Sequence, residues 1–289
     1  MVQPSIAVLV NPERRALLDE LLDALGDKDV QLIEPDDAGA LEAAVAEVIG
    51  SVDVVAAIGG DGTQRTVASV MKGSQTALAV VPGGTVNLLA RVLGMTSVDA
   101  VAAAIRSGNR RIIDTGVVDG GTFVLNASTG YDAAVMQRVD DGAKRWGRLG
   151  YFMTGVRTLV TQRPRHVEVI VDGESFFAGR AMTVMVTNVP QRGSADFEVA
   201  LGGALDDGLL DVVVQRCDSA VTMARTLWSL HRERTPRTDD LVIAHGRTID
   251  VRWSVLVAAQ RDGDANDPVT DAHHRVEPAS LTVCVPITD

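Results

Sequence analysis

The sequence predicts two domains, an α/β domain built on a parallel sheet and a C-terminal antiparallel β-sandwich. Strand and helix patterns alternate from the start of the chain to about residue 105, and strand patterns lie close together after residue 110. Alternation is typical of a parallel sheet covered on both faces, whereas closely spaced strands indicate antiparallel pairing. We therefore place the domains at residues 1–114 and 115–289, and the last strand could return to the first domain.

In the first domain, short apolar runs indicate strands and longer mixed stretches indicate helices. Strands are expected at residues 6–10, 30–33, 52–58 and 77–81. Helices are expected at residues 16–25 and 40–49, from residue 63 onward, at residues 88–93, and in a last segment that ends near residue 105. Continuous apolar runs of this length favour strands that are buried on both faces. The first domain should therefore carry its ligand at one edge of an open parallel sheet.

In the second domain, turn signals separate most of the strand patterns. Strands are expected at residues 121–126, 166–171, 181–189, 210–215, 248–252 and 281–285, and helices near residues 147–160 and 221–231. Asp119-Gly120-Gly121 and Asp172-Gly173-Glu174 are typical of hairpin turns. The polar stretch 260–277 is expected to contain a mobile loop. This spacing predicts a sandwich or a barrel.

The composition argues against a nucleic-acid-binding or membrane-spanning protein. The chain has 289 residues, of which 46% are hydrophobic, and a formal net charge of -11. A chain this acidic is poorly suited to phosphate backbones. No apolar run reaches the roughly 18 residues of a membrane span, and the first residues lack a signal-peptide pattern. We expect a cytoplasmic protein with peripheral membrane contact at most, in which Cys217 and Cys284 are free thiols.

The most informative segment is Gly59-Gly60-Asp61-Gly62-Thr63, which follows the apolar run 52–58. Glycines let a ligand approach the backbone N–H groups, and the positive end of a helix that starts at Thr63 would face the same point. This geometry suits a phosphate, and the Asp61 carboxylate suits a Mg²⁺ ion bound to it. The segment has neither the P-loop nor the G-x-G-x-x-G pattern, and a turn that binds nothing is the alternative.

A second glycine-rich turn, Pro82-Gly83-Gly84-Thr85-Val86-Asn87, follows the next strand of the first domain. Two such turns lie at the same edge of a parallel sheet, which is where open α/β sheets bind ligands. Asn11, after the first strand, and Asn87 could contact the nucleotide or could cap helices. The expected nucleotide-binding residues are Asn11, Gly59, Gly60, Gly62, Thr63, Gly83, Gly84, Thr85 and Asn87.

These two turns together resemble the catalytic domain of the diacylglycerol kinase family, which includes sphingosine, ceramide and bacterial lipid kinases. Further matching segments follow in the expected order at residues 114–116, 123–126, 129–132, 144–147, 205–211 and 262–264. The ordered set spans nearly the whole chain, so it is far more specific than any one segment. The resemblance implies an NAD kinase-like α/β domain, a β-sandwich domain, and transfer of the γ-phosphoryl group of ATP to a lipid hydroxyl with Mg²⁺.

The resemblance also implies roles for four acidic residues. Asp61 and Asp114 would belong to the Mg-ATP site and act in catalysis and metal binding. Asp264 stands where the family usually has the glutamate proposed as general base. Its side chain is shorter, which puts in doubt whether its carboxylate reaches the acceptor hydroxyl. Asp207, within the acidic segment 206–211, would belong to a structural Mg²⁺ site. The residues after Asn11 also depart from the family, because Glu13-Arg14-Arg15 stands where small residues are usual.

Each of these residues has a simpler interpretation. Asp114 could be a turn or cap residue, residues 262–264 could be only a loop, and the acids of residues 206–211 could be solvated at a hairpin. Helix 147–160 follows basic residues and carries aromatic ones (Lys144, Arg145, Trp146, Tyr151 and Phe152). That pattern fits a helix at a lipid surface, and it fits an ordinary core helix better.

Three functions are compatible with these motifs. The first is a lipid kinase, with diacylglycerol as a representative acceptor and the membrane surface as its partner. The second is a kinase of a soluble acceptor, because NAD kinases share the Gly-Gly-Asp-Gly turn. The third is a nucleotide-binding regulator without turnover, which only the shortened Asp264 favours. No motif separates the lipid acceptors or ATP from GTP, and a homodimer is possible.

Overall fold

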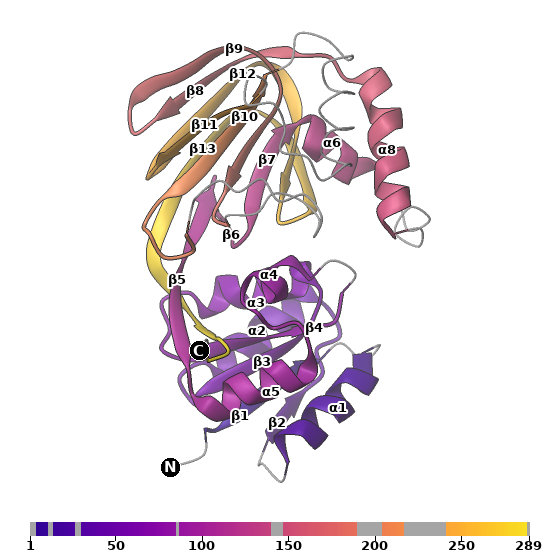
Figure 1. Cartoon of the computed structure of the whole chain (residues 1–289), viewed down its shortest axis with the longest axis vertical. Coiled ribbons are helices and arrows are strands. Elements are labelled where there is room, and N and C mark those ends of the chain that lie inside the picture. Colours follow the sequence, from indigo (N-terminus) through magenta and orange to yellow (C-terminus); the bar gives the residue numbers. More distant parts are fainter. Residues whose placement is uncertain are drawn as a thin grey trace. The chain divides into compact units, whose positions relative to one another are not determined.

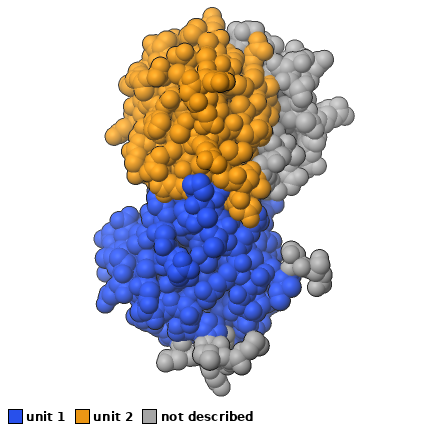
Figure 2. All heavy atoms as spheres, turned by 90° about the vertical axis from the view of Figure 1, so that its left-hand side faces the viewer, with its two compact units in different colours: residues 1–115, 278–289 blue, residues 116–277 orange. Residues whose placement is uncertain are grey.

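A computed structural model describes residues 4–10, 14–26, 30–84, 87–139, 147–189, 204–216 and 241–287. The chain divides into two compact units, which are coloured separately in Figure 2. Unit 1 contains residues 1–115 and 278–289, and unit 2 contains residues 116–277. The chain therefore passes between the units twice, once within β5 (Arg110–Val118) and once within β13 (Asp264–Cys284).

Unit 1 is built on parallel strands in the order β2 (Val30–Ile33), β1 (Ile6–Val10), β3 (Val54–Gly59) and β4 (Ala77–Pro82). Each neighbouring pair runs in the same direction. The end of β13 adds a further parallel partner, since Val283 pairs with Leu78 of β4. All residues of β1 and β3 are buried, which explains why their sequences are continuous apolar runs rather than alternating ones.

The helices of unit 1 are α1 (Arg15–Leu25), α2 (Ala38–Val48), α3 (Asp61–Met71), α4 (Leu88–Val92) and α5 (Val98–Ser107). Helix α1 packs against α5 and α2 packs against α3, and the two pairs lie on opposite sides of the sheet (Figure 1). Capping side chains start two of these helices. Asp37 accepts a hydrogen bond from Ala40 N at 2.8 Å, and Ser97 accepts one from Ala100 N at 3.2 Å.

Unit 2 is an antiparallel sheet structure that closes on itself. Its strands are β6 (Gly121–Phe123), β7 (Asn126–Gly130), β8 (Arg165–Val171), β9 (Glu174–Thr187), β10 (Leu210–Arg216), β11 (Leu241–Gly246), β12 (Thr248–Arg261) and most of β13. The long strands β9 and β12 each pair with both β7 and β8, so these four strands form a ring of pairings. Valine and other apolar side chains from these strands fill the interior around Phe123 and Trp253. The arrangement agrees with the predicted sandwich or barrel.

Two helices, α6 (Tyr131–Arg138) and α8 (Gly147–Thr161), pack on one another beside these strands (Figure 1). Their contact is a small apolar cluster that includes Tyr131 and Leu159, and the Tyr131 hydroxyl donates to Gly155 O at 2.7 Å. In the described part of the chain, no helix is long and apolar enough to cross a membrane.

The expected loop at residues 260–277 is wrong. These residues form the end of β12, a two-residue turn at Asp262–Gly263, and most of β13. The turn residues have φ angles of 49° and 87° and Arg261 pairs with Asp264, as in a type I′ hairpin. The stretch is polar because many of its side chains face solvent, not because it is irregular. Strands β5 and β11 were not expected, and the expected helix 221–231 lies outside the described residues.

Candidate functional site

The two glycine-rich turns of unit 1 pack directly against each other. Gly83 N donates to Gly59 O at 3.0 Å. A Cβ added at Gly84 would lie 2.7 Å from the Cα of Gly60, and one at Gly59 would lie 2.5 Å from the Cβ of Thr63. No side chain fits at these distances, so local packing requires glycine at both positions. The two turns form one glycine-lined surface at the carboxyl ends of β3 and β4.

The carboxylate of Asp61 links the start of α3 to the start of α4. Asp61 is the first residue of α3, and its Oδ1 accepts a hydrogen bond from Leu89 N at 3.3 Å. Burial raises the pKa of Asp61, although the backbone N–H groups of Leu89, Leu88 and Asn87 act in the opposite direction. A divalent cation beside this carboxylate would favour its charged form. The donor chemistry of Asp61 therefore fits Mg²⁺.

Asn87 holds the second turn rather than the helix that follows it. Its Oδ1 accepts from Gly84 N at 2.7 Å and its Nδ2 donates to Gly84 O at 2.8 Å. The backbone of Asn87 is left-handed, with φ 51°, and its side chain makes no capping bond to α4. The amide therefore shapes the backbone that faces Gly60. Gly62 and Thr63 lie in the first turn of α3, whereas Asn11 and Thr85 lie outside the described residues.

Gln64 is a buried positioning residue that the sequence analysis did not select. Its Nε2 donates to Ala57 O at 2.7 Å and to Val81 O at 3.2 Å. These carbonyls belong to β3 and β4, so one amide joins the strand ends that precede the two glycine turns. Gln64 shares the buried face of α3 with Val67 and Met71. A glutamine on an apolar helical stripe was the available signal.

Asp114 is a strand residue of unit 1, not a turn or cap residue. It lies in β5, is 2% exposed, and accepts a hydrogen bond from Ala279 N at 2.7 Å. Its neighbour Thr115 makes a hydroxyl contact of 2.9 Å with Ser280. These contacts join β5 to the part of β13 that belongs to unit 1. The role of Asp114 in a Mg-ATP site stays a prediction.

In unit 2, the turn that precedes Asp264 is held by two buried side chains. The Asp262 carboxylate accepts three backbone hydrogen bonds at 2.9 Å, from Val124, Leu125 and Asn126. Gln260 Oε1 accepts from Gly263 N at 2.7 Å. Asp264 is the first residue of β13 and is exposed. A proton acceptor at this position would therefore follow a turn whose backbone is held by hydrogen bonds.

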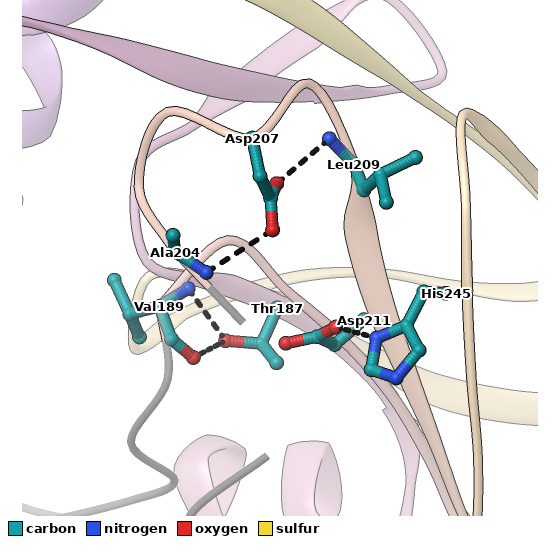
Figure 3. A network of polar contacts seen from close by, with 7 residues as sticks. All are labelled: Thr187, Val189, Ala204, Asp207, Leu209, Asp211 and His245. Atoms are coloured by element: carbon teal, nitrogen blue, oxygen red, sulfur yellow. Dashed lines mark hydrogen bonds and ion pairs between the residues drawn. The ribbon is translucent and has the colours of Figure 1, made fainter. Parts of the chain in front are cut away.

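The expected Mg²⁺ site at Asp207 stays a prediction, and in the structure backbone N–H groups bind this carboxylate. The two oxygens of Asp207 accept from Ala204 N at 3.2 Å and Leu209 N at 3.0 Å (Figure 3). Asp211 turns instead to Nδ1 of His245, its partner on β11 (Figure 3). No group of three or more His, Cys, Asp or Glu side chains gathers closely enough to hold a metal among the residues that the structure describes.

Burial raises the pKa of Asp211, and the hydrogen bond from His245 opposes that shift. Asp207 adds a smaller raising effect through its charge. The imidazole thus supplies the polar partner that a buried carboxylate needs. The sequence offered no signal for this pair, because β11 was not expected.

Unit 1 thus carries a glycine-lined edge and an acidic helix start where open α/β sheets bind ligands, and unit 2 is a closed antiparallel structure. Residues 6–118 match the diacylglycerol kinase catalytic domain, and residues 126–285 match the YegS C-terminal NAD kinase beta sandwich-like domain. The two matches together span most of the chain, which belongs to the diacylglycerol kinase family.

Several known proteins are similar along most of the chain. A diacylglycerol kinase of Bacillus subtilis is 28% identical over 230 residues, which cover 78% of this chain and 75% of that protein. A diacylglycerol kinase of Mycobacterium tuberculosis is 26% identical over 266 residues, 89% of this chain and 84% of that protein. The crystal structure of a diacylglycerol kinase from Bacillus anthracis str. Sterne superposes with a TM-score of 0.74 at 17% identity, covering 99% and 98% of the two chains.

A more distant structure is an NAD kinase from Archaeoglobus fulgidus in complex with ATP. It has a TM-score of 0.54 at 13% identity and covers 98% of this chain and 93% of its own. Likeness at this level shows a shared fold. The resemblance to diacylglycerol kinases expected from the glycine turns is confirmed by the family matches.

Proposed function

We propose that this protein is an ATP- and Mg²⁺-dependent kinase that phosphorylates a lipid hydroxyl, with diacylglycerol as the first acceptor to test. The observation that carries the proposal is the packed pair of glycine turns with Asp61 beside them. Family membership supports phosphoryl transfer, and the names of the relatives support a lipid acceptor.

The residues of unit 1 would bind and orient the nucleotide. The backbone N–H group at Gly60 suits a phosphate oxygen, because glycine leaves the peptide open to a ligand, whereas the N–H group of Gly84 is already bound to Asn87 Oδ1. Asp61, with Asp114 as the second candidate, would hold Mg²⁺. When bound, the cation would offset negative charge on the phosphates. Asn87 and Gln64 would keep the turns in place.

The acceptor hydroxyl would lose its proton to the carboxylate of Asp264. The hydroxyl oxygen forms a bond to the γ-phosphorus, the bond to the β–γ bridging oxygen breaks, and ADP leaves. Phosphoryl transfer depends mainly on position, so the fixed backbone before Asp264 favours this assignment.

A lipid acceptor implies contact with a membrane surface, which we propose is peripheral and on the cytoplasmic side. In α8, Met153 and Val156 are 51% and 41% exposed, whereas Leu159 packs toward α6. The helix therefore combines a core-facing side with an exposed apolar side. Trp146 lies outside the described residues, as do the side chains of Tyr151 and Phe152.

A soluble acceptor is the second candidate, because the fold is shared with an NAD kinase that binds ATP. The two proposals separate in one experiment. Purified protein is incubated with γ-labelled Mg·ATP and either a total lipid extract or NAD. The Asp61→Ala protein is treated in the same way as the control. Label in the organic phase that depends on Asp61 supports the lipid kinase. NADP formation without lipid labelling would replace it with the second candidate, and neither product would contradict both.

A further inference from the structure

We propose that Gln260 is a positioning residue that holds the Asp262–Gly263 turn and so sets the place of the Asp264 carboxylate. The inference rests on the proposed function, in which Asp264 accepts the proton of the acceptor hydroxyl. Gln260 lies in β12, two residues before the turn, and only 4% of it is exposed. Its amide touches both the turn and the neighbouring strand β7.

In the described part of unit 2, three turns are of one type. Asp119–Gly120, Asp172–Gly173 and Asp262–Gly263 all have φ angles near 50° and 86°. Each closes a two-residue hairpin. In each, the Asp carboxylate accepts at least one backbone N–H group from another segment: His273 N for Asp119, and Arg247 N and Thr248 N for Asp172.

The third turn differs from the other two in its burial and in its second restraint. Asp262 is 6% exposed, whereas Asp119 and Asp172 are exposed residues. Asp262 accepts three backbone hydrogen bonds, and a neighbouring side chain, Gln260, binds the turn glycine as well. A tight hairpin does not need this second restraint, because the residue two places before the aspartate is apolar in the other two turns. The extra restraint lies at the turn that leads into Asp264.

The other end of the Gln260 amide is equally constrained. Its Nε2 lies 2.8 Å from Asn126 Oδ1, 2.8 Å from Ser128 Oγ and 3.4 Å from Asp132 Oδ2. Ser128 in turn donates to Asp132 Oδ2 at 2.6 Å. Because acceptors surround Nε2 and a donor meets Oε1, the amide has one favourable orientation. Through Gln260, hydrogen bonds therefore fix Gly263 relative to β7 and to the start of α6.

The short side chain of Asp264 explains why such a restraint matters. A glutamate can adjust its reach through one more rotatable bond, whereas the aspartate carboxylate stays close to its own Cα. The backbone at Asp264 must then be placed correctly, because a proton acceptor works only within hydrogen-bond distance. Gln260 acts through Gly263 and needs no contact with the substrate.

The test compares Gln260→Leu, Gln260→Glu, Asp132→Asn and the double variant Gln260→Glu/Asp132→Asn. Asp172→Asn, in the exposed turn of the same type, is the matched control. Each protein is assayed for kcat, for KM of ATP and lipid, for melting temperature, and for hydrogen exchange at the Gly263 amide. Selective labelling of glycine makes that amide observable by NMR.

We expect Gln260→Leu to lower kcat at least about tenfold, with KM for ATP nearly unchanged, and to speed exchange at Gly263. Gln260→Glu keeps an oxygen that accepts from Gly263 N. It also places a second carboxylate next to that of Asp132, and the two charges repel, so kcat should fall. The double variant should regain much of that loss, since an asparagine amide at position 132 can donate to the new carboxylate at position 260. If Gln260→Leu fails to fold, the two variants with glutamate at position 260 still test the proposal, because they keep a polar side chain there.

Three results would overturn the proposal: wild-type kcat in a folded Gln260→Leu protein, lost activity with unchanged exchange at Gly263, or no recovery in the double variant. A wild-type protein that labels no lipid would refute the proposed function instead. The exchange measurement does not depend on activity. It therefore still decides whether Gln260 holds the turn.

Discussion

Gly60 and Gly84 face each other so closely that a Cβ on Gly84 would lie 2.7 Å from the Gly60 Cα. They belong to different βα turns, which are also joined by the hydrogen bond from Gly83 N to Gly59 O. The glycines thus serve the fold before any nucleotide binds. Loss of activity after a glycine substitution here would not by itself identify a phosphate contact.

Gly84→Ala should reduce both stability and ATP binding. The added methyl group would meet backbone at Gly60 and the Asn87 side chain, at 2.7 and 3.0 Å, and backbone cannot move aside cheaply. We expect a loss of about 1–3 kcal/mol in the free energy of unfolding, as for other overpacked sites. Urea denaturation measures stability and calorimetry measures ATP affinity.

Gly39→Ala is the matched control for this substitution. Gly39 lies in α2, and its nearest neighbour to an added Cβ is Asp37 Oδ1 at 3.4 Å, an ordinary contact. Alanine is the better helix former, so this variant should be as stable as the wild type or more stable. Equal effects at both positions would mean that the Gly60–Gly84 contact is not what makes Gly84→Ala costly.

The strands that could be predicted from sequence are those with an unambiguous apolar pattern. The bounds expected for the first two strands, residues 6–10 and 30–33, are those of β1 and β2. The hairpins at Asp119 and Asp172 were also predicted. Asp262–Gly263 carries the same Asp-Gly signal, but its polar flanks were interpreted as a loop and its aspartate as part of a catalytic motif.

Side-chain roles that depend on the opposite strand could not be predicted. Gln64 and Gln260 matter because of the carbonyls, amides and hydroxyls around them, which lie on other strands. The same holds for His245, whose partner Asp211 is 34 residues away. The glycine turns were found because their chemistry is local, whereas the contact of Asp61 with Leu89 spans 28 residues.

Asp61→Asn should change how stability depends on pH in the absence of nucleotide. Burial raises the pKa of Asp61, so above the ordinary value of 3.8 the folded protein holds its proton longer than the unfolded chain does. The free energy of unfolding of the wild type therefore falls, at this site, as pH rises through that window. Asparagine does not titrate, so melting temperatures measured from pH 4 to 7 should favour the variant increasingly toward pH 7.

Addition of Mg·ATP at pH 7 should make the wild type melt at a higher temperature than Asp61→Asn, the reverse of the order without nucleotide. A ligand that binds the folded state raises its stability. The bound cation would interact with the charged carboxylate of the wild type, so Mg·ATP should stabilise the wild type much more than the variant. An equal thermal shift in both proteins would show that Asp61 does not contribute to Mg-ATP binding. Asp37→Asn, at the exposed start of α2, is the control for a general loss of negative charge.

His274 should make the protein sensitive to mild acid. The ring is buried in unit 2, packs edge-on against Phe123, and has Nδ1 at 3.1 Å from Ile249 O. Burial lowers its pKa from 6.5 to about 4. Between these values the unfolded chain binds a proton that the folded protein does not, so stability falls as pH falls through this window.

The full effect of that proton is about 3 kcal/mol from pH 6.5 to pH 4. His274→Gln removes the titration and can still donate to Ile249 O. The difference in free energy of unfolding between wild type and variant, measured by urea denaturation, should therefore shift toward the variant as pH falls. A constant difference from pH 7 to pH 4 would show that His274 is not protonated on unfolding. His166→Gln, at an exposed position of β8, is the control.

His245→Ala should destabilise unit 2 by leaving the Asp211 carboxylate without its imidazole partner. The Asp211 side chain is 6% exposed and that of His245 is 47% exposed, so solvent can partly replace the lost contact. We expect a loss of about 1–2 kcal/mol, less than for a fully buried pair. A double-mutant cycle with Asp211→Asn isolates the pair, and a coupling energy above about 0.5 kcal/mol is expected. Additive effects would instead mean that Asp211 is stabilised mainly by its surroundings. In that case its burial would depend on the β10–β11 backbone pairing rather than on the histidine.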